Sequence, residues 1–222
     1  MKLENKIAVV TGARRGMGKS HALALAKEGA KVVVSDISLE ECQTVVEEIK
    51  AAGGDALAAK CDVSSKAEVE AMFRSAVEKF GKVDILVNNA GIYQSKPFLE
   101  MTEEEWDKTI DINLKGEFLC AQEAAKIMMK NKWGRIINIA SIASGQVGVG
   151  IAGGAHYTAS KGGIIGMSET LAIELAPYGI NVSVVAPGAI DTPMVQSANM
   201  PKEVMDGLMN VIPLKRMGKA EE

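Results

Sequence analysis

A tyrosine and a lysine share one helical face in the stretch HYTASKGGIIGMSETLAIELA. Tyr157 and Lys161 stand at positions i and i+4, so a helix through them places the phenol and the ammonium a single turn apart. A fixed cation favours the phenolate and lowers the pKa of the tyrosine toward neutral pH. The pair therefore predicts proton exchange with an alcohol or carbonyl oxygen, although the same spacing is common on solvated helix faces.

The chain opens with a glycine-rich turn between a predicted strand and a predicted helix. The β-branched run KIAVV is typical of a strand, and KSHALALAKEGA is strongly helical. Gly12, Gly16 and Gly18 lie between them and would let backbone amides approach a pyrophosphate at the positive end of the helix. The spacing is G-x-x-x-G-x-G rather than G-x-G-x-x-G. The glycines therefore lie in the strand–turn–helix context of the dinucleotide-binding fingerprint, but at a different spacing.

An aspartate ends the second predicted strand, AKVVVSD. Asp36 can accept hydrogen bonds from the adenosine ribose hydroxyls and would repel the 2′-phosphate of NADP. Arg14 and Arg15 favour NADP instead, because a guanidinium could pair with that phosphate. We expect NAD as the cofactor, with NADP possible. Ser38 is better placed than Asp36 to cap a helix that starts near Leu39.

Further motifs follow in order along the chain. They are Thr11 to Gly18, Asp62-Val63, Asn88-Asn89-Ala90-Gly91, Asn113 in INLKG, Ser141 in NIAS, Tyr157-x-x-x-Lys161, and Pro187-Gly188 with Thr192. This series resembles the short-chain dehydrogenase/reductase family, in the compact branch that contains 3-oxoacyl-acyl-carrier-protein reductases, glucose dehydrogenases and secondary-alcohol dehydrogenases. The resemblance runs from about residue 3 to the end of the chain. It implies an oxidoreductase that acts on CH–OH groups.

The resemblance also implies a role for each motif. The catalytic residues would be Asn113, Ser141, Tyr157 and Lys161, with Asn113 holding a water that relays protons to Lys161. The cofactor-binding residues would be Gly12, Arg14, Arg15, Gly16, Met17, Gly18, Asp36, Ile37, Asp62, Val63, Asn89, Ala90, Gly91, Tyr157, Lys161, Pro187, Gly188, Ile190 and Thr192. No metal ligands are expected, because the cysteines and histidines lack metal-site spacing.

Two serines compete for one catalytic role. Ser141 follows Asn138 at the spacing that the family shows, whereas the family's commoner spacing to the tyrosine selects Ser144. The glycine-rich loop GQVGVGIAGGAH before Tyr157 is interpreted as longer by about a turn, which accounts for the difference. We therefore expect Ser141 at the end of its strand, where open α/β sheets place their chemistry.

Regular alternation of strands and helices defines the expected fold. Strands are predicted near residues 6–11, 31–36, 55–60, 84–87, 134–140 and 180–186, with a long helix over about 103–131. This pattern predicts an α/β Rossmann-type fold, a doubly wound parallel sheet flanked by helices in three layers, α/β/α. Residues 1–222 are expected to form one domain. The Met-rich segment 193–212 is interpreted as a substrate lid or as an ordinary surface helix.

The resemblance includes one departure. Family members normally continue through another helix and a last strand, which this chain lacks. In relatives that part supplies an edge strand and much of a subunit interface. We therefore expect a homodimer or homotetramer that is weakened if the segment is truly absent.

Composition narrows the function class. The chain has 222 residues, 47% of them hydrophobic and 24% charged, with a net charge of −3 that gives no reason to propose nucleic acid. No apolar run reaches the length of a membrane span, and the three cysteines suit a reducing cytoplasm. A cytoplasmic enzyme with a small-molecule alcohol or ketone substrate is expected.

Three functions are carried forward. The first is an NAD-linked dehydrogenase of a secondary alcohol or ketone, with Tyr157 as general acid/base. The alternative is a 3-oxoacyl-acyl-carrier-protein reductase that uses NADPH, although Ile173 stands where those reductases tend to have arginine. A different class is a catalytically idle dinucleotide-binding scaffold or sensor, against which the intact Ser141, Tyr157 and Lys161 argue.

Overall fold

A computed structural model describes residues 1–146, 148, 150–197 and 202–222. Its centre is a six-stranded, fully parallel sheet in the order β3-β2-β1-β4-β5-β6. The strands are β1 Ile7–Thr11, β2 Lys31–Asp36, β3 Ala56–Lys60, β4 Ile85–Asn88, β5 Gly134–Ile139 and β6 Ile180–Val185. All six predicted strands are confirmed to within a residue or so, as is the α/β fold class.

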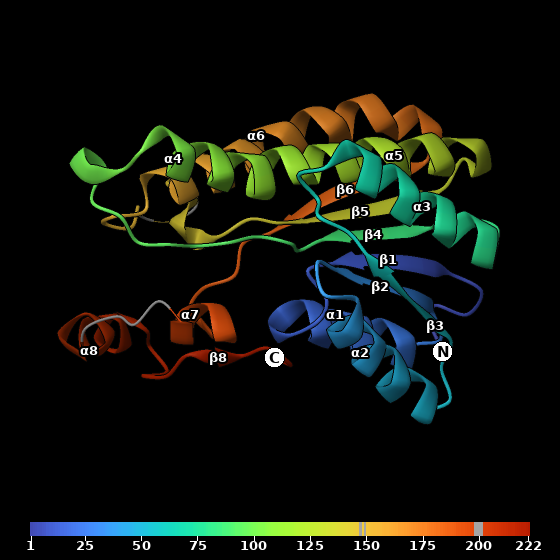
Figure 1. Ribbon diagram of the computed structural model, residues 1–222, viewed down its shortest axis with the longest axis horizontal. Helices are drawn as coiled ribbons and strands as arrows, with labels where there is room; N and C mark the ends of the chain where they lie inside the picture. Colours follow the sequence, from blue (N-terminus) through green and yellow to red (C-terminus); the bar gives the residue numbers. More distant parts are fainter. Residues whose placement is uncertain (147, 149, 198–201) are drawn as a thin grey trace.

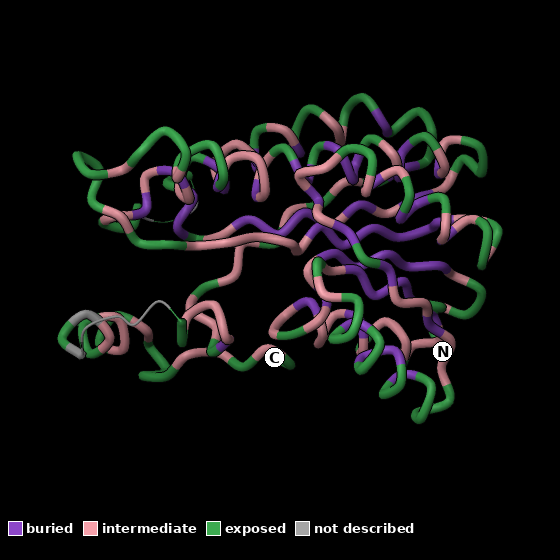
Figure 2. The backbone as a smooth tube through the Cα atoms, in the orientation of Figure 1, coloured by how far each residue is buried: buried purple, intermediate pink, exposed green. Residues whose placement is uncertain are grey.

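Helices cover both faces of this sheet (Figure 1). On one face lie α1 Gly16–Lys27 and α2 Leu39–Ala51. On the other lie α3 Lys66–Phe80, α4 Glu103–Ile110, α5 Gly116–Asn131 and α6 Ala155–Leu175. Figure 2 shows the buried residues concentrated in the strands between these layers. Parallel strands buried on both faces are expected to be continuously apolar, as β1 is.

Local capping residues place the helices. The Ser38 hydroxyl accepts a hydrogen bond from the Glu41 amide at the start of α2, as the sequence predicted. Thr102 and Glu105 form a reciprocal capping box at the start of α4. Gly81, in the left-handed region at φ 83°, ends α3. These signals fix where each helix begins or ends relative to the sheet edge that it approaches.

The long helix expected over 103–131 is interrupted. Between α4 and α5 the backbone forms a π-turn, η2 Asp111–Lys115, which contains Asn113. A π-turn inserts one residue into the helical hydrogen-bond ladder and is frequent at functional sites. The apolar periodicity of the sequence does not distinguish such a turn from a continuous helix.

The remaining elements lie outside the main sheet and the helices that cover it. They are the short 3₁₀ turns η1 Phe98–Glu100, η3 Ile142–Ser144 and η4 Ala176–Tyr178, the two-stranded ladder of β7 Ile190–Asp191 and β8 Gly218–Lys219, and the helices α7 Pro193–Ser197 and α8 Lys202–Val211. The predicted lid corresponds to α7 and α8, and its residues 198–201 lie outside the described residues. Within the described residues, no helix has the length and apolarity that a membrane crossing requires.

Candidate active site

The glycine-rich turn after β1 is as tight as its sequence suggests. Gly12 has φ +64°, and a methyl group in place of its hydrogen would lie 2.7 Å from the Ala90 Cα. A methyl group on Gly18 would overlap the carbonyl oxygen of Gly12. Larger residues at either position would therefore force the backbone apart. The turn leads directly into α1, whose N-terminal end points toward the carboxyl edge of the sheet (Figure 1).

Hydrogen bonds join this turn to the end of β4. Asn89 Nδ2 donates to the carbonyl oxygens of Thr11 at 3.0 Å and Gly12 at 3.1 Å. In return, Thr11 Oγ1 accepts from the backbone amides of Asn89 and Ala90, both at 3.1 Å. The amide of Asn89 thus links the ends of the neighbouring strands β1 and β4. The role of Asn89 is structural, because these hydrogen bonds hold the backbone at the carboxyl edge of the sheet in place.

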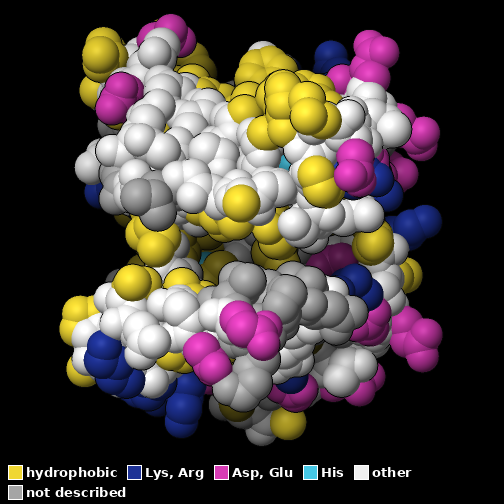
Figure 3. All heavy atoms as spheres, turned by 90° about the vertical axis from the view of Figure 1, so that its left-hand side faces the viewer, with side chains coloured by type: hydrophobic (Ala, Val, Ile, Leu, Met, Phe, Trp, Pro, Cys, Tyr) yellow, Lys and Arg dark blue, Asp and Glu magenta, His cyan; other side chains and the backbone are white. Residues whose placement is uncertain are grey.

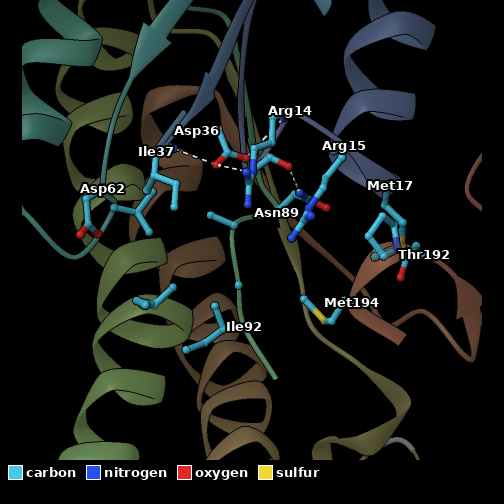
Figure 4. Close-up of a pocket in the computed structure, with 18 of the residues that line it drawn as sticks. Arg14, Arg15, Met17, Asp36, Ile37, Asp62, Asn89, Ile92, Thr192 and Met194 are labelled. Atoms are coloured by element: carbon cyan, nitrogen blue, oxygen red, sulfur yellow. Dashed lines mark hydrogen bonds and ion pairs between the residues drawn. The ribbon is translucent and has the colours of Figure 1, made fainter. Parts of the chain in front are cut away.

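A cavity of about 400 Å³ lies above these strand ends, at the carboxyl edge of the sheet. Figure 3 shows the molecule hollowed on this side, and Figure 4 shows the lining side chains. Open α/β sheets bind their ligands at this edge, where the strand order reverses. The predicted cofactor residues that line the cavity are Gly12, Arg14, Arg15, Gly16, Met17, Gly18, Asp36, Ile37, Asp62, Val63, Asn89, Ala90, Gly91 and Thr192.

Other predicted cofactor residues do not line this cavity. Pro187, Gly188 and Ile190 are outside its lining, because the chain after β6 turns toward η3 and then β7. The Pro187 carbonyl accepts a hydrogen bond from the Ile142 amide at 3.1 Å. Tyr157 and Lys161 also lie outside the lining, behind the cavity wall at Gly91.

Six residues that line the cavity were not among those predicted from the sequence. They are Cys61, Ile92, Lys108, Ile112, Pro193 and Met194. Five of them lie within two residues of a predicted site residue in the chain, so widening each motif by a residue or two would have found them. Lys108 comes from α4 and reaches the cavity through tertiary packing.

The Asp36 carboxylate is held by Arg14. Arg14 Nε lies 3.2 Å from Asp36 Oδ1, and the Arg14 amide donates to Asp36 Oδ2 at 3.3 Å. The same guanidinium also pairs with Glu41. Figure 4 shows Arg14 and Asp36 turned toward one another at the end of β2. One of the two arginines that favour NADP is thus engaged by two carboxylates, whereas Arg15 is exposed.

A second group of residues lies beyond Gly91. Burial raises the pKa of Tyr157, and the hydroxyl of Ser141, which lies near the phenol, has a smaller effect in the opposite direction. Lys161 Nζ lies 5.9 Å from the centre of the tyrosine ring. The structure therefore brings Ser141, Tyr157 and Lys161 together. Ser144 is buried in η3, where its Oγ accepts from the Gln146 amide at 3.3 Å.

Lys161 is almost completely buried. Its Nζ donates to the Ile139 carbonyl at the end of β5, at 2.6 Å, and lies 3.7 Å from Glu117 Oε1. Burial lowers the pKa of Lys161, and the Glu117 carboxyl acts in the opposite direction. Glu117 was not among the residues selected from the sequence.

Asn113 joins the π-turn to the loop after β4. Its Nδ2 donates to the Ile92 carbonyl at 3.0 Å and to Ser160 Oγ at 3.2 Å. Its Oδ1 accepts from the Ile92 amide at 2.8 Å. A methyl group on Gly91 would lie 3.3 Å from Asn113 Oδ1 and 3.8 Å from Lys161 Nζ. The backbone of Gly91 thus lies between the cavity and the polar side chains of Asn113 and Lys161.

An aromatic contact that the sequence did not indicate borders the phenol. The Tyr93 and Tyr157 rings meet edge to face, with centroids 5.2 Å apart and an interplanar angle of 74°. Such pairs fix the direction of a ring. Tyr93 follows Gly91 and Ile92 in the loop that Asn113 anchors, so the same loop shapes both the cavity and the surroundings of Tyr157.

The fold and this cluster define a member of one class of enzyme. The family model described as short chain dehydrogenase matches residues 6–203, so the chain belongs to this family of oxidoreductases. The chain is 41% identical over 222 residues to (2S)-[(R)-hydroxy(phenyl)methyl]succinyl-CoA dehydrogenase subunit BbsD of Thauera aromatica, which covers 100% of this chain and 87% of the relative. It is 44% identical over 221 residues to a 3-oxoacyl-[acyl-carrier-protein] reductase of Synechocystis sp., covering 99% and 86%.

Solved structures agree with this assignment. Levodione reductase superposes with a TM-score of 0.91 at 35% identity, covering 99% of this chain and 87% of that one. The structure of gox2181 gives a TM-score of 0.94 at 35% identity, covering 99% and 86%. The resemblance inferred from the motifs is therefore confirmed at the level of the family and the fold.

Proposed function

We propose that this protein interconverts a secondary alcohol and a ketone with NAD(H), using Tyr157 as the general acid/base. The observation that supports the proposal most directly is the arrangement of Ser141, Tyr157 and Lys161 behind the cavity that the glycine-rich turn borders. A phenol with a hydroxyl on one side and a buried ammonium on the other can give up or accept a proton.

The residues present fit a dinucleotide. The tight turn at Gly12 and Gly18 leaves room for a pyrophosphate at the start of α1, and Asp36 lies where an adenosine ribose would be bound. Asp62, Asn89, Ala90, Gly91 and Thr192 would complete the binding site. When bound, NAD(H) would exchange a hydride with the substrate carbon.

The protein's own groups handle the proton. In reduction, Tyr157 donates a proton to the substrate oxygen while the Ser141 hydroxyl holds that oxygen by a hydrogen bond. In oxidation, the phenolate of Tyr157 removes the proton from the alcohol. Lys161 stabilises the phenolate by its charge and is also proposed to hold the nicotinamide ribose. Asn113 is proposed to support a proton-relaying water next to Lys161.

The geometry at Asp36 supports NAD over NADP. The carboxylate lines the cavity at the end of β2, where it would repel a 2′-phosphate. Arg14, which could otherwise receive that phosphate, is paired with both Asp36 and Glu41. Arg15 remains the residue through which NADP could be accommodated.

The substrate is proposed to enter between the sheet edge and α7–α8. Pro193 and Met194, at the start of α7, line the cavity, which supports the interpretation of 193–212 as a lid. We also propose that the enzyme acts in the cytoplasm as a homodimer or homotetramer, which size-exclusion chromatography with light scattering would test.

A 3-oxoacyl-acyl-carrier-protein reductase is the second candidate, because the Synechocystis sp. relative carries that name. That activity would use NADPH by resemblance, and the carboxylate at Asp36 is unfavourable for it. Ile173, where such reductases tend to have arginine, has 77% of its surface exposed on α6 and offers no charge to an acidic carrier protein.

The first experiment is a fluorescence titration of the purified chain with NADH and NADPH in parallel. Tighter binding of NADH would support the proposal and direct substrate screening to secondary alcohols. Tighter binding of NADPH would favour the acyl-carrier-protein reductase, and turnover of an acyl-carrier-protein thioester would then be measured. Binding without turnover of any alcohol or ketone would favour a dinucleotide sensor.

A further inference from the structure

A carboxyl group lies buried behind the proposed catalytic lysine. Glu117, near the start of α5, has only 2% of its surface exposed. Neither of its carboxylate oxygens has a hydrogen-bond partner among the described residues, although Oε1 lies 3.7 Å from Lys161 Nζ. An ionised carboxylate without hydrogen bonds is costly to bury unless it is paired with a charge or protonated.

Among the described residues, Lys161 is the only charged group that affects the pKa of Glu117. From β4, Asn88 Nδ2 donates to the Glu117 backbone carbonyl at 3.2 Å and to Asn138 Oδ1 at 2.9 Å, so the amide is not available to the carboxylate. From α6, Lys161 is the charged group closest to the carboxyl, and Tyr157 is near enough for Glu117 to have a minor effect on its pKa. From α5 itself, the Cys120 thiol faces the same space, and burial keeps the pKa of that thiol well above its usual range.

The environment affects the protonation of both partners. Burial raises the pKa of Glu117 to about 8, although Lys161 lowers it. Burial lowers the pKa of Lys161, and Glu117 raises it. Two groups so close in space titrate as a pair, with the protonation of each depending on the other.

We propose that Glu117 is a positioning residue that acts through Lys161, holding a proton at neutral pH and releasing it at alkaline pH so that Lys161 stays charged beside Tyr157. This inference rests on the proposed function of Lys161. When Glu117 is neutral, the ammonium acts on the phenol without a competing negative charge. When the pH rises, the ionised carboxylate becomes the counterion that keeps the buried lysine from losing its proton.

Glu117→Gln provides a sharp test, because the amide resembles the protonated acid in shape but cannot ionise. Wild type and variant should therefore agree in turnover and NADH affinity near pH 6.5. At higher pH the variant should lose both, because Lys161 without its counterion deprotonates about one to two pH units earlier. Removal of Glu117 also lowers the pKa of Tyr157 directly, but this is the weakest of the effects on that phenol.

Glu123→Gln is the matched control. It makes the same chemical change on the same helix, at a carboxylate that pairs with Lys126 on the surface. Its pH profile should match the wild type. Equal profiles for wild type, Glu117→Gln and Glu123→Gln across the pH range would overturn the proposal, as would a uniform loss in Glu117→Gln at every pH, which indicates a purely structural role.

Infrared spectroscopy separates this inference from the proposed function. A protonated buried carboxyl should give a C=O stretching band in the wild type that disappears as the pH rises through about 8 and is absent in Glu117→Gln. If Glu117→Gln does not fold, Lys161→Met replaces it, and the band should persist to higher pH because the cation has been removed. Absence of any titrating band in the wild type would refute the proposal. A titrating band in a protein that turns over no alcohol would instead refute only the proposed enzyme activity.

Discussion

The guanidinium of Arg14 lies against the carboxylate of Asp36, with Nε 3.2 Å from Oδ1. Arg14 lies in the turn after β1 and Asp36 at the end of β2, and both line the cavity. In the proposed binding mode, the pair engages a cation that could otherwise meet a 2′-phosphate and places a carboxylate there instead. Cofactor choice is therefore expected to depend on one ion pair.

Asp36→Ala should shift the cofactor preference toward NADP. The substitution removes the repulsive carboxylate and releases Arg14 to pair with the phosphate, so the ratio of NADPH to NADH affinity should rise at least about tenfold, equivalent to about 1.4 kcal/mol. Parallel fluorescence titrations measure this ratio. Adding Arg14→Ala should cancel the gain for NADPH, and an unchanged ratio in Asp36→Ala would show that Asp36 does not select the cofactor.

Tyr157→Phe should abolish turnover while leaving the cofactor site intact. Loss of a general acid/base costs about 10²–10⁴-fold in rate. NADH affinity should change little, because the ring stays in place against Tyr93. Steady-state kinetics and a titration on the same preparation provide both quantities. Turnover at the wild-type rate would exclude Tyr157 as the proton donor.

Ser141→Ala should move the pH profile of alcohol oxidation. The Ser141 hydroxyl lowers the pKa of Tyr157, against the larger raising effect of burial, so its removal raises that pKa. Oxidation needs the phenolate, and the rise of kcat/KM with pH should therefore shift to higher pH in the variant. Ser144→Ala is the comparison, since Ser144 Oγ accepts a hydrogen bond from Gln146. A shift in Ser144→Ala and none in Ser141→Ala would assign the role to Ser144.

Gly18→Ala should destabilise the protein and weaken dinucleotide binding. The added methyl group would overlap the Gly12 carbonyl, and relieving such an overlap costs about 1–3 kcal/mol. Gly166→Ala is the control, because a methyl group there meets nothing within 4 Å on an exposed face of α6. Replacing this helical glycine should stabilise the fold by up to about 1 kcal/mol. Chemical denaturation distinguishes the two, and equal effects would contradict the tight turn.

The sheet and the glycine-rich turn could be predicted from the sequence because their signals are local. Six short, mostly apolar runs were predicted as strands and form the six strands of the sheet, and Ser38 was expected to cap α2 as it does. Ser141 was chosen over Ser144 from the spacing to Asn138 that the family shows and from its position at the end of a strand, and its hydroxyl lies near the Tyr157 phenol.

The rest of the site depends on contacts that local patterns do not contain. Glu117 stands next to Phe118 in a helical stretch of mixed polarity, where a charged residue usually marks the solvent side. Its burial follows from the packing of α5 against β4 and α6 at Lys161. Lys108 reaches the cavity for a similar reason, since the π-turn changes the orientation of α4 relative to α5.

That π-turn separates α4 from α5, so the two helices present different faces to their surroundings. Its extra residue rotates the face of α4 relative to that of α5 by about 100°. The α4 segment can thus present Lys108 to the cavity, while α5 buries Leu119, Cys120 and Ala124 against the sheet. Substitutions on α4 can therefore reshape the cavity rim without rotating the packed face of α5, so this short interruption allows the ligand-facing and core-facing parts of the helix to vary separately.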